Sequence, residues 1–458
     1  MSESAVTIGV DGQPVDRVAV VGAGLAGCLL AALLAKRGLS VDLYERRPDP
    51  RRAGAERGRS INLAISARGL DALSRVGLDK QALADALPMH GRTLHSRTGE
   101  IGYQSYSADG ARAINSISRS GLNASLLDCA EQTPGVTIHF AHQLTGLDWR
   151  TGEMTFHTPD GDKAVDADIV IGSDGAYSAV RRAIQFTEGF DFSQSYLPHG
   201  YKELTIPATG SGDFAIDEHS LHIWPRGSSM MIALPNLDRS FTCTLFWPKE
   251  GPDSFSSLDS AEKIDAYFRA HYPDAHALMP TLVEDFQYNP VGSLVTVRAF
   301  PWVRGRVALL GDAAHAIVPF FGQGANCSFE DCTELDRCLT DTNGDWAKAF
   351  ELYQTRRKPN SDAIAEMALE NFVEMSDKVN SKVFQAVTNT RHWLERRMPG
   401  RYVSRYELVS FTTTPYSQIN RRIRKQDSVV GGVSAVLLAI ATLGLSKVFG
   451  RGKNKEAR

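Results

Sequence analysis

The stretch that decides the fold is VAVVGAGLAGCLLAALLAKRGLSVDLYE, residues Val18–Glu45. A β-branched run precedes three glycines in GxGxxG spacing, and an apolar helix and a second strand follow. This is the βαβ pattern of a dinucleotide-binding fold. Gly22 allows a tight turn, Gly24 lets backbone N–H groups approach a pyrophosphate, and Gly27 lets the helix pack closely on the sheet. Glu45 at the end of the second strand is placed to bind a ribose 2′-hydroxyl.

The length and composition of the chain suit a folded protein of more than one domain. Its 458 residues are enough for two or more lobes, and 43% hydrophobic with 22% charged residues is ordinary for such a protein. The net charge of -3 gives no reason to expect a nucleic-acid partner. The six cysteines lack CxxC or paired spacing, which indicates a reducing, cytoplasmic-facing location and no metal site.

The C-terminal region contains an uncharged stretch, VVGGVSAVLLAIATLGL (Val429–Leu445), with basic residues on both sides. Its length lies at the low edge of the roughly 17–25 residues that a membrane-spanning helix needs. Its terminal position, small residues and basic flanks favour a membrane anchor within segment 428–448. A buried or interfacial helix that closes a soluble fold is the alternative.

The order of strands and helices predicts an α/β fold in several parts. Residues 1–190 and 300–345 carry buried strands that end in glycine turns, which predicts a Rossmann-like domain. Residues 191–299 carry strand-like runs, such as Ser220–Trp224, between turn clusters, which predicts an inserted antiparallel sheet that contacts the substrate. Residues 346–427 are expected to be helical and to line the pocket. Because there is no second GxGxxG set, a second dinucleotide is expected to bind only transiently.

Two further blocks point to the same ligand as the glycine fingerprint. Asp174-Gly175 and Gly311-Asp312 each follow a buried strand, and strand ends are where such sheets bind ligands. The Asp312 carboxylate can hold ribityl hydroxyls, and the helix that opens at Gly324 can stabilise negative charge on a flavin ring. Taken singly, each pair is better explained as a turn that ends a strand. In this order and with these flanks, they predict FAD.

Several of these blocks resemble a known family. GAGLAG, SDGAYSAVR and LLGDAAHAIVPFFGQGANCSFED resemble the motifs of the single-component aromatic flavin monooxygenases, and RGRSINLAIS, HGYKEL, HIWP and MALENFVEM resemble the kynurenine 3-monooxygenase family. The resemblance implies hydroxylation of L-kynurenine to 3-hydroxy-L-kynurenine with FAD, NADPH and O2, through a flavin hydroperoxide. It also implies a C-terminal membrane contact. A related enzyme acting on a phenolic aromatic acid, and a membrane-tethered flavoprotein scaffold, are the alternatives.

The resemblance also implies substrate-binding residues. Arg92 matches an arginine that pairs with the substrate carboxylate, a task suited to a guanidinium fork. Asn371 matches an asparagine that binds the amino acid end, and this pair favours an amino acid over a phenolic acid. The remaining positions are two tyrosines and a short loop between substrate and flavin: Tyr106, Tyr406, Pro319 and Phe320.

Helical spacing supports the substrate residues around Asn371. Met367, Asn371, Glu374 and Met375 fall at i, i+4, i+7 and i+8 and therefore share one helix face. An amide and a carboxylate on an otherwise apolar face suit a polar pocket. We therefore expect Glu374 and Met375 to contact the substrate with Asn371.

The cofactor residues complete the predicted site. Arg119 matches an arginine that contacts FAD, and Arg57 or Arg59 is expected to reach its phosphates, although Arg57 also suits a solvated surface. His315 is expected to be a structural histidine near the flavin loop, not a general base. The full set of predicted cofactor residues is Gly22, Gly24, Gly27, Glu45, Arg46, Arg57, Arg119, Asp174, Gly175, Asp312, Gly324 and Asn326.

Overall fold

The structure is a computed structural model that describes residues 7–53, 62–107, 109–376, 395, 397, 398 and 400–428, without the side chains of residues 53 and 374–376. Three predictions therefore fall outside the described part of the chain. They are the role of Arg57 or Arg59, the side-chain roles of Glu374 and Met375, and the anchor segment from Val429 onward.

The glycine fingerprint forms the centre of the first sheet, as predicted. This sheet has six strands in the order β18-β19-β12-β1-β2-β8, and all of its neighbours except β18 and β19 pair in parallel. Helix α1 (Leu25–Ala35) is buried on every side from Gly27 to Ala35, which explains why its sequence is apolar all round. The strands are β1 (Arg17–Val21), β2 (Ser40–Tyr44), β8 (Val136–His139), β12 (Ile169–Gly172), β18 (Val303–Arg304) and β19 (Val307–Leu309).

Gly27 is required by this close packing. A Cβ atom at that position would lie 1.9 Å from the carbonyl oxygen of Gly22. Any side chain would therefore push α1 away from the turn that follows β1.

The second sheet is larger than the sequence predicted. Its seven strands run in the order β17-β13-β16-β15-β14-β5-β6. Two of them come from outside the predicted 191–299 insert, and one of these, β5, pairs with β14 in parallel. The strands are β5 (Gly91–His95), β6 (Ile101–Ser105), β13 (Asp191–Ile206), β14 (Ser220–Pro225), β15 (Met230–Pro235), β16 (Phe241–Pro248) and β17 (Gly292–Phe300).

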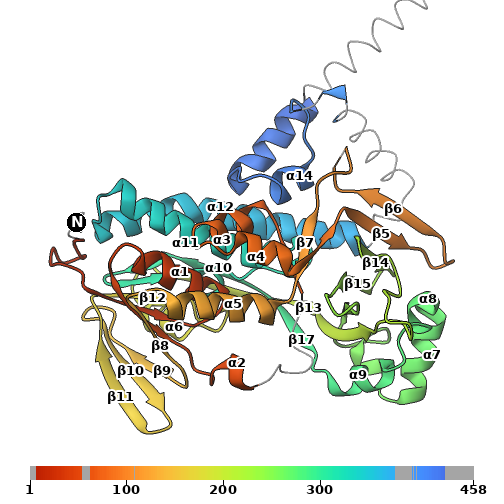
Figure 1. The fold of residues 1–458 in the computed structure, drawn as a ribbon, viewed down its shortest axis with the longest axis horizontal. Helices are drawn as coiled ribbons and strands as arrows, with labels where there is room; N and C mark the ends of the chain where they lie inside the picture. The colour runs from red at the N-terminus through yellow and green to blue at the C-terminus, as the bar shows by residue number, and fades with distance from the viewer. Residues whose placement is uncertain are drawn as a thin grey trace, which may run out of the picture.

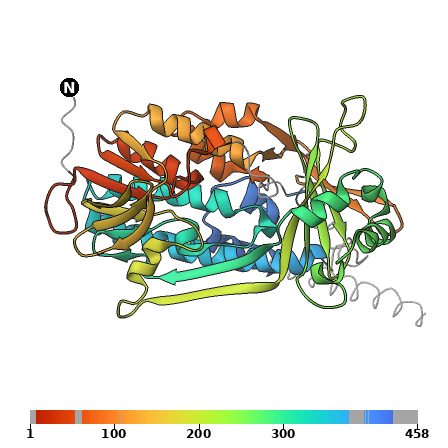
Figure 2. The same cartoon turned by 90° about the horizontal axis from the view of Figure 1, so that it is seen from below.

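A long ribbon connects the two lobes. Strand β13 pairs with β17 over Asp191–Tyr196 and with β16 over His199–Ile206, so one strand reaches from the first lobe into the second (Figure 2). Three helices gather beside the second sheet (Figure 1), and Trp224, Trp247 and Phe268 lie in the core that they share with it. These helices are α7 (Ala261–His271), α8 (Pro273–His276) and α9 (Leu282–Tyr288).

Smaller elements complete the first lobe. Helix α5 (Arg119–Gln132) begins where the Ser118 hydroxyl accepts the Gly121 N–H and caps the helix. One three-stranded sheet comprises β3 (Leu63–Ile65), β7 (Ile114–Ile117) and β4 (Ala86–Met89). Another comprises β9 (Gln143–Leu147), β10 (Glu153–Thr158) and β11 (Gly161–Asp166). The short helices are α2 (Pro50–Ala53), α3 (Ala67–Ser74), α4 (Asp79–Ala84), α6 (Ala179–Ile184), α10 (Asp312–His315), η1 (Phe255–Ser257) and η2 (Pro319–Phe321).

Two long helices lie side by side behind these sheets, in agreement with the predicted helical region (Figure 1). They are α11 (Gly324–Asp341) and α12 (Trp346–Ser376). Helix α14 (Arg405–Ser410) and helical residues 416–428 follow, and Leu408, Val409 and Tyr416 share a core with Phe320 of η2. Within the described ranges, no helix has the length and apolar character needed to cross a membrane.

Candidate active site

One large cavity, about 590 Å³ in volume, is lined by both sheets. Part of its lining comes from the glycine fingerprint and the two glycine–aspartate turns, and part comes from strands β14–β16. It brings together the following predicted cofactor residues: Gly22, Gly24, Glu45, Arg46, Arg119, Asp174, Gly175, Asp312 and Gly324.

The fingerprint presents free helix N–H groups to the cavity. Helix α1 starts after Gly24 without a side-chain cap, and a Cβ built on Gly24 would meet no atom within 4 Å. The turn is held by Glu45, which is buried and accepts the Ala23 N–H at 3.1 Å and the Arg47 Nε–H at 2.9 Å. Open space beside unpaired N–H groups is what a pyrophosphate needs.

Asp174 supports the same region from the next strand. Its Oδ2 accepts the N–H groups of Ala179 at 2.6 Å and Val180 at 3.2 Å, so it caps α6. Burial raises the pKa of Asp174, although these hydrogen bonds oppose the rise. The aspartate therefore holds its loop against the helix while it also lines the cavity.

The predicted flavin end contains a second helix start of the same kind. Helix α11 begins at Gly324 without a side-chain cap, and Asp312 opens α10 on the cavity lining. Asn326 was also predicted to bind the cofactor, but the structure does not place it in the cavity wall. Its amide accepts the Ser66 N–H and donates to the carbonyls of Ala64 and Gly322, so it joins the loop to β3.

These residues fit FAD. Phosphates need N–H donors and cations, which the two uncapped helices and the arginines of the lining supply. Ribose and ribityl hydroxyls need acceptors, which Glu45 and Asp312 supply. Arg182, next to the predicted SDGAYSAVR block, also lines the cavity, and the sequence prediction missed it.

Arg92 and two tyrosines form a cluster beside the apolar part of the cavity. The guanidinium carbon of Arg92 lies 4.7 Å from the ring centroid of Tyr406 and 5.5 Å from that of Tyr106. Burial, and then the neighbouring Tyr406, raise the pKa of Tyr106 well above its ordinary value. The Tyr106 hydroxyl therefore stays protonated and can donate a hydrogen bond, next to a fixed positive charge.

The apolar lining was not predicted. Met230, Ile232 and Leu234 alternate along β15 and so face the same side of the sheet, and Leu221 and Phe246 line the cavity from β14 and β16. The signal was present in the i, i+2, i+4 spacing of the apolar residues. It could not be distinguished from ordinary core packing without knowing which face of the sheet meets the cavity.

The short loop Pro319–Phe321, which includes the predicted Pro319 and Phe320, lines the same cavity. Phe320 packs against Phe246, with ring centroids 5.0 Å apart, and against Phe372 of α12 at 4.2 Å. Asn371 donates from Nδ2 to the Phe320 carbonyl at 2.6 Å and is buried behind the loop, and it is not in the cavity lining. Asn371 therefore holds the loop in this structure.

His315 lies beneath the cavity, away from its lining. Its Nε2 is 2.5 Å from Oδ2 of Asp331. Burial lowers the pKa of His315, but the adjacent Asp331 carboxylate raises it, and the net effect places it well above the ordinary value. The ligand atoms of His315, Cys327 and Asp331 lie within 4.8 Å of one another, yet the Arg357 guanidinium already contacts Asp331 at 2.7 Å and the Cys327 sulfur at 3.3 Å. The Arg357 guanidinium therefore supplies the positive charge that a metal ion would bring to this cluster.

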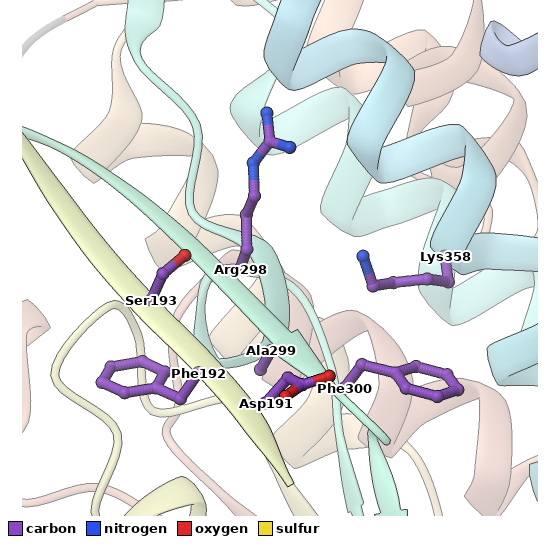
Figure 3. Close-up of a pocket in the computed structure, with 7 residues that line it drawn as sticks. All are labelled: Asp191, Phe192, Ser193, Arg298, Ala299, Phe300 and Lys358. Carbon is purple, nitrogen blue, oxygen red and sulfur yellow. The ribbon is translucent and has the colours of Figure 1, made fainter.

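A second, open groove of about 470 Å³ lies between the β13–β17 ribbon and α12 (Figure 3). Each of its two cations faces a carboxylate of α12. Lys358 Nζ is 2.5 Å from Asp362 Oδ2, and the Arg298 guanidinium is 3.9 Å from Glu366 Oε1. Its positive charges are thus compensated locally, and we assign this groove no ligand.

Comparisons with known proteins agree with this geometry. The FAD binding domain family matches residues 16–368. The chain is 50% identical over 422 residues to a kynurenine 3-monooxygenase of Myxococcus xanthus, covering 92% of this chain and 91% of that one. It is 47% identical over 413 residues to a kynurenine 3-monooxygenase of Dictyostelium discoideum, covering 87% and 89%.

Solved structures show the same fold at lower identity. A 2-methyl-3-hydroxypyridine-5-carboxylic acid oxygenase superimposes with a TM-score of 0.66 at 21% identity, covering 80% of this chain and 94% of that one. A p-nitrophenol 4-monooxygenase from Pseudomonas putida superimposes with a TM-score of 0.65 at 18% identity, covering 83% and 94%.

Proposed function

Since the chain belongs to the kynurenine 3-monooxygenase family, within the FAD binding domain family, we infer that it hydroxylates L-kynurenine to 3-hydroxy-L-kynurenine with NADPH and O2. It is an FAD-dependent monooxygenase. The observation that carries the substrate assignment is that Arg92 and Tyr406 line the cavity that fits FAD, beside its apolar wall, with Tyr106 stacked on Tyr406.

The substrate's charged end suits the arginine cluster. The Arg92 guanidinium can bind a carboxylate through two parallel N–H groups, and the Tyr106 hydroxyl adds a neutral donor. Tyr106 is buried and Arg92 and Tyr406 are half-buried, so competition from water for these interactions is reduced. Asn371, one turn beyond Met367 on α12, is proposed to bind the amino acid end once the Pro319–Phe321 loop adjusts.

The aromatic ring suits the apolar wall. Met230, Ile232 and Phe246 can hold a flat ring and exclude water from it. The chemistry that FAD supplies when bound is O2 activation after hydride transfer from NADPH. An aniline nitrogen already activates the ring carbon next to it, so these side chains need only orient that carbon.

The test is turnover by the purified protein with NADPH and air. L-kynurenine should accelerate NADPH oxidation, and mass spectrometry should show a product heavier by one oxygen atom that matches 3-hydroxy-L-kynurenine. A hydroxybenzoate serves as the control substrate and should not be hydroxylated. Peroxide release without a hydroxylated kynurenine, or faster hydroxylation of the phenolic acid, would overturn the assignment.

We also propose that the chain contacts a membrane through Val429–Leu445. The support is the uncharged sequence with RRIRK before it and a second basic cluster after it. Ending the chain before Val429 should move the protein from the membrane fraction to the supernatant with kynurenine turnover retained. Unchanged partitioning would contradict the proposal, and lost turnover would indicate a segment that packs on the enzyme.

A further inference from the structure

A chain of buried charged groups lies behind the predicted flavin end of the cavity. Asp331 of α11 is fully buried and accepts hydrogen bonds from three elements: the Gly311 N–H at 3.0 Å, His315 Nε2 at 2.5 Å and Arg357 Nε at 2.7 Å. Arg357 also donates to Glu330 at 2.6 Å. We call these residues, together with Arg68, the buried charge network.

The network connects distant parts of the fold. Glu330 accepts a second hydrogen bond, at 2.6 Å, from Arg68 of α3, and Arg68 also donates to the Thr414 carbonyl of the C-terminal region. Arg68 stacks on Tyr416 at 3.9 Å, and the Tyr416 hydroxyl donates to Gln323, directly before α11. The Gly311 turn, α11, α12 and the C-terminal region are thus joined through side chains.

Stability alone is a poor explanation for such a network. Transferring charged groups from water into the interior is costly, and well-packed apolar residues of similar volume often stabilise a fold as much as a buried ion pair does. A network in which each carboxylate oxygen of Asp331 and Glu330 accepts from a fixed donor holds its residues in a single geometry. The geometry it fixes here begins at the Gly311 N–H.

Gly311 is the residue whose position matters for the cofactor. It adopts φ of +60°, a conformation that favours glycine, and it is followed by Asp312, which lines the cavity. A shift of this turn would move the Asp312 carboxylate relative to the hydroxyls that it is placed to bind. Asp331 contacts the turn directly and does not line the cavity.

We propose that Asp331, held by Arg357, is a positioning residue that sets the Gly311–Asp312 turn for FAD binding. Asp331 acts through the backbone of Gly311 and not by contact with the cofactor. The role belongs to the FAD site and is independent of which aromatic substrate the enzyme takes.

The experiment compares Asp331→Asn with a matched variant on the same helix, Asp336→Asn. Asp336 pairs with Arg37 at 2.6 Å, so both variants lose a carboxylate of α11 that accepts from an arginine, and only one of them touches the turn. Apo-protein is titrated with FAD while flavin fluorescence is recorded, visible circular dichroism of the bound flavin is measured, and thermal unfolding of the apo-protein is followed.

Asp331→Asn should weaken FAD binding by about tenfold, the size expected for one charge-assisted hydrogen bond, and should alter the visible dichroism. Asp336→Asn should change neither. Parent-like FAD affinity and dichroism in Asp331→Asn would overturn the proposal, as would equal effects in both variants. If Asp331→Asn does not fold, Arg357→Lys, which keeps the charge but loses the fork, should show the same two changes, and parent-like values there would overturn the proposal.

Discussion

Tyr106, directly after β6, and Tyr406, in α14, stack face to face with ring centroids 4.6 Å apart and ring planes 13° apart. The two tyrosines come from parts of the chain that are far apart in sequence. Their stack joins the C-terminal region to the sheet that carries Arg92, and Phe321 of the short loop Pro319–Phe321 stacks on Tyr406, with ring centroids 5.8 Å apart. The C-terminal region therefore contributes Tyr406 to the wall of the cavity.

The first prediction concerns Arg92. Arg92→Lys keeps the charge but loses the fork that suits a carboxylate, so the KM for L-kynurenine should rise about tenfold. Steady-state NADPH oxidation measures this change. Arg97→Lys is the control, because Arg97 lies after the same strand and donates to the Arg226 carbonyl outside the cavity. An unchanged KM in Arg92→Lys would remove Arg92 from the substrate site.

The second prediction concerns Asn371. Asn371→Ala leaves the buried Phe320 carbonyl without this donor, which should cost roughly 1–3 kcal/mol of stability and loosen the loop. The share of consumed NADPH that appears as hydrogen peroxide should rise with kynurenine present. Asn360→Ala on the same helix, where Asn360 binds Ser417, is the control and should stay coupled. Equal peroxide shares in both variants would show that the loop does not depend on Asn371.

The parts of the fold that could be predicted are those whose sequence signals lie within one short stretch of the chain. The fingerprint from Val18 to Glu45 carries its own strand, turn and helix signals, and it folded as predicted. The seven-stranded sheet was predicted too narrow because the partner of β14 is β5, which precedes it in sequence by more than a hundred residues. No local pattern reports such a pairing, since strand order depends on the whole chain.

The candidate site divides in the same way. Gly24, Asp312 and Arg92 line the cavity. They could be predicted because each lies in a sequence motif that indicates both the type of residue and its place in the fold. Asn326 sits in the correct motif, but its amide is satisfied by backbone groups of β3 and the loop. A sequence shows that a polar residue is present near a helix start, but not whether the backbone or a ligand takes its hydrogen bonds.

The third prediction concerns pH. Burial and the neighbouring Glu395 raise the pKa of Glu407 from 4.5 to about 7, although Arg112 at 2.8 Å opposes the rise. Protonation of Glu407 therefore favours the folded state. Its contribution to the free energy of unfolding is fully present below pH 4.5 and is lost as the pH rises through about 7. After a discount for solvent screening, the loss is about 1 kcal/mol.

Glu407→Gln should remove this pH dependence. Urea unfolding at pH 5 and at pH 8 should show a smaller difference in the free energy of unfolding for the variant than for the parent. Glu370→Gln, which removes an exposed carboxylate paired with Arg405 of α14, shows the effect of losing a surface ion pair alone. The same pH difference in parent and Glu407→Gln would show that this carboxyl does not carry the effect.

The last prediction separates the two roles of the fingerprint glycines. A Cβ at Gly24 meets nothing within 4 Å, so Gly24→Ala should fold, but its methyl group would occupy the space beside the free N–H groups of α1. Crowding of this kind typically costs about 1–3 kcal/mol, so FAD affinity should fall roughly 10- to 100-fold while apo-protein unfolding stays unchanged.

Gly27→Ala should behave differently. Its Cβ would meet the Gly22 carbonyl oxygen at 1.9 Å, so the apo-protein itself should be destabilised. Gly210→Ala, at an exposed position with open space outside the cavity, is the control for both variants. FAD titration together with thermal unfolding of apo-protein distinguishes the cases. If Gly24→Ala bound FAD like the parent, the pyrophosphate would have to lie elsewhere than at the start of α1, since a methyl group at that position would crowd it.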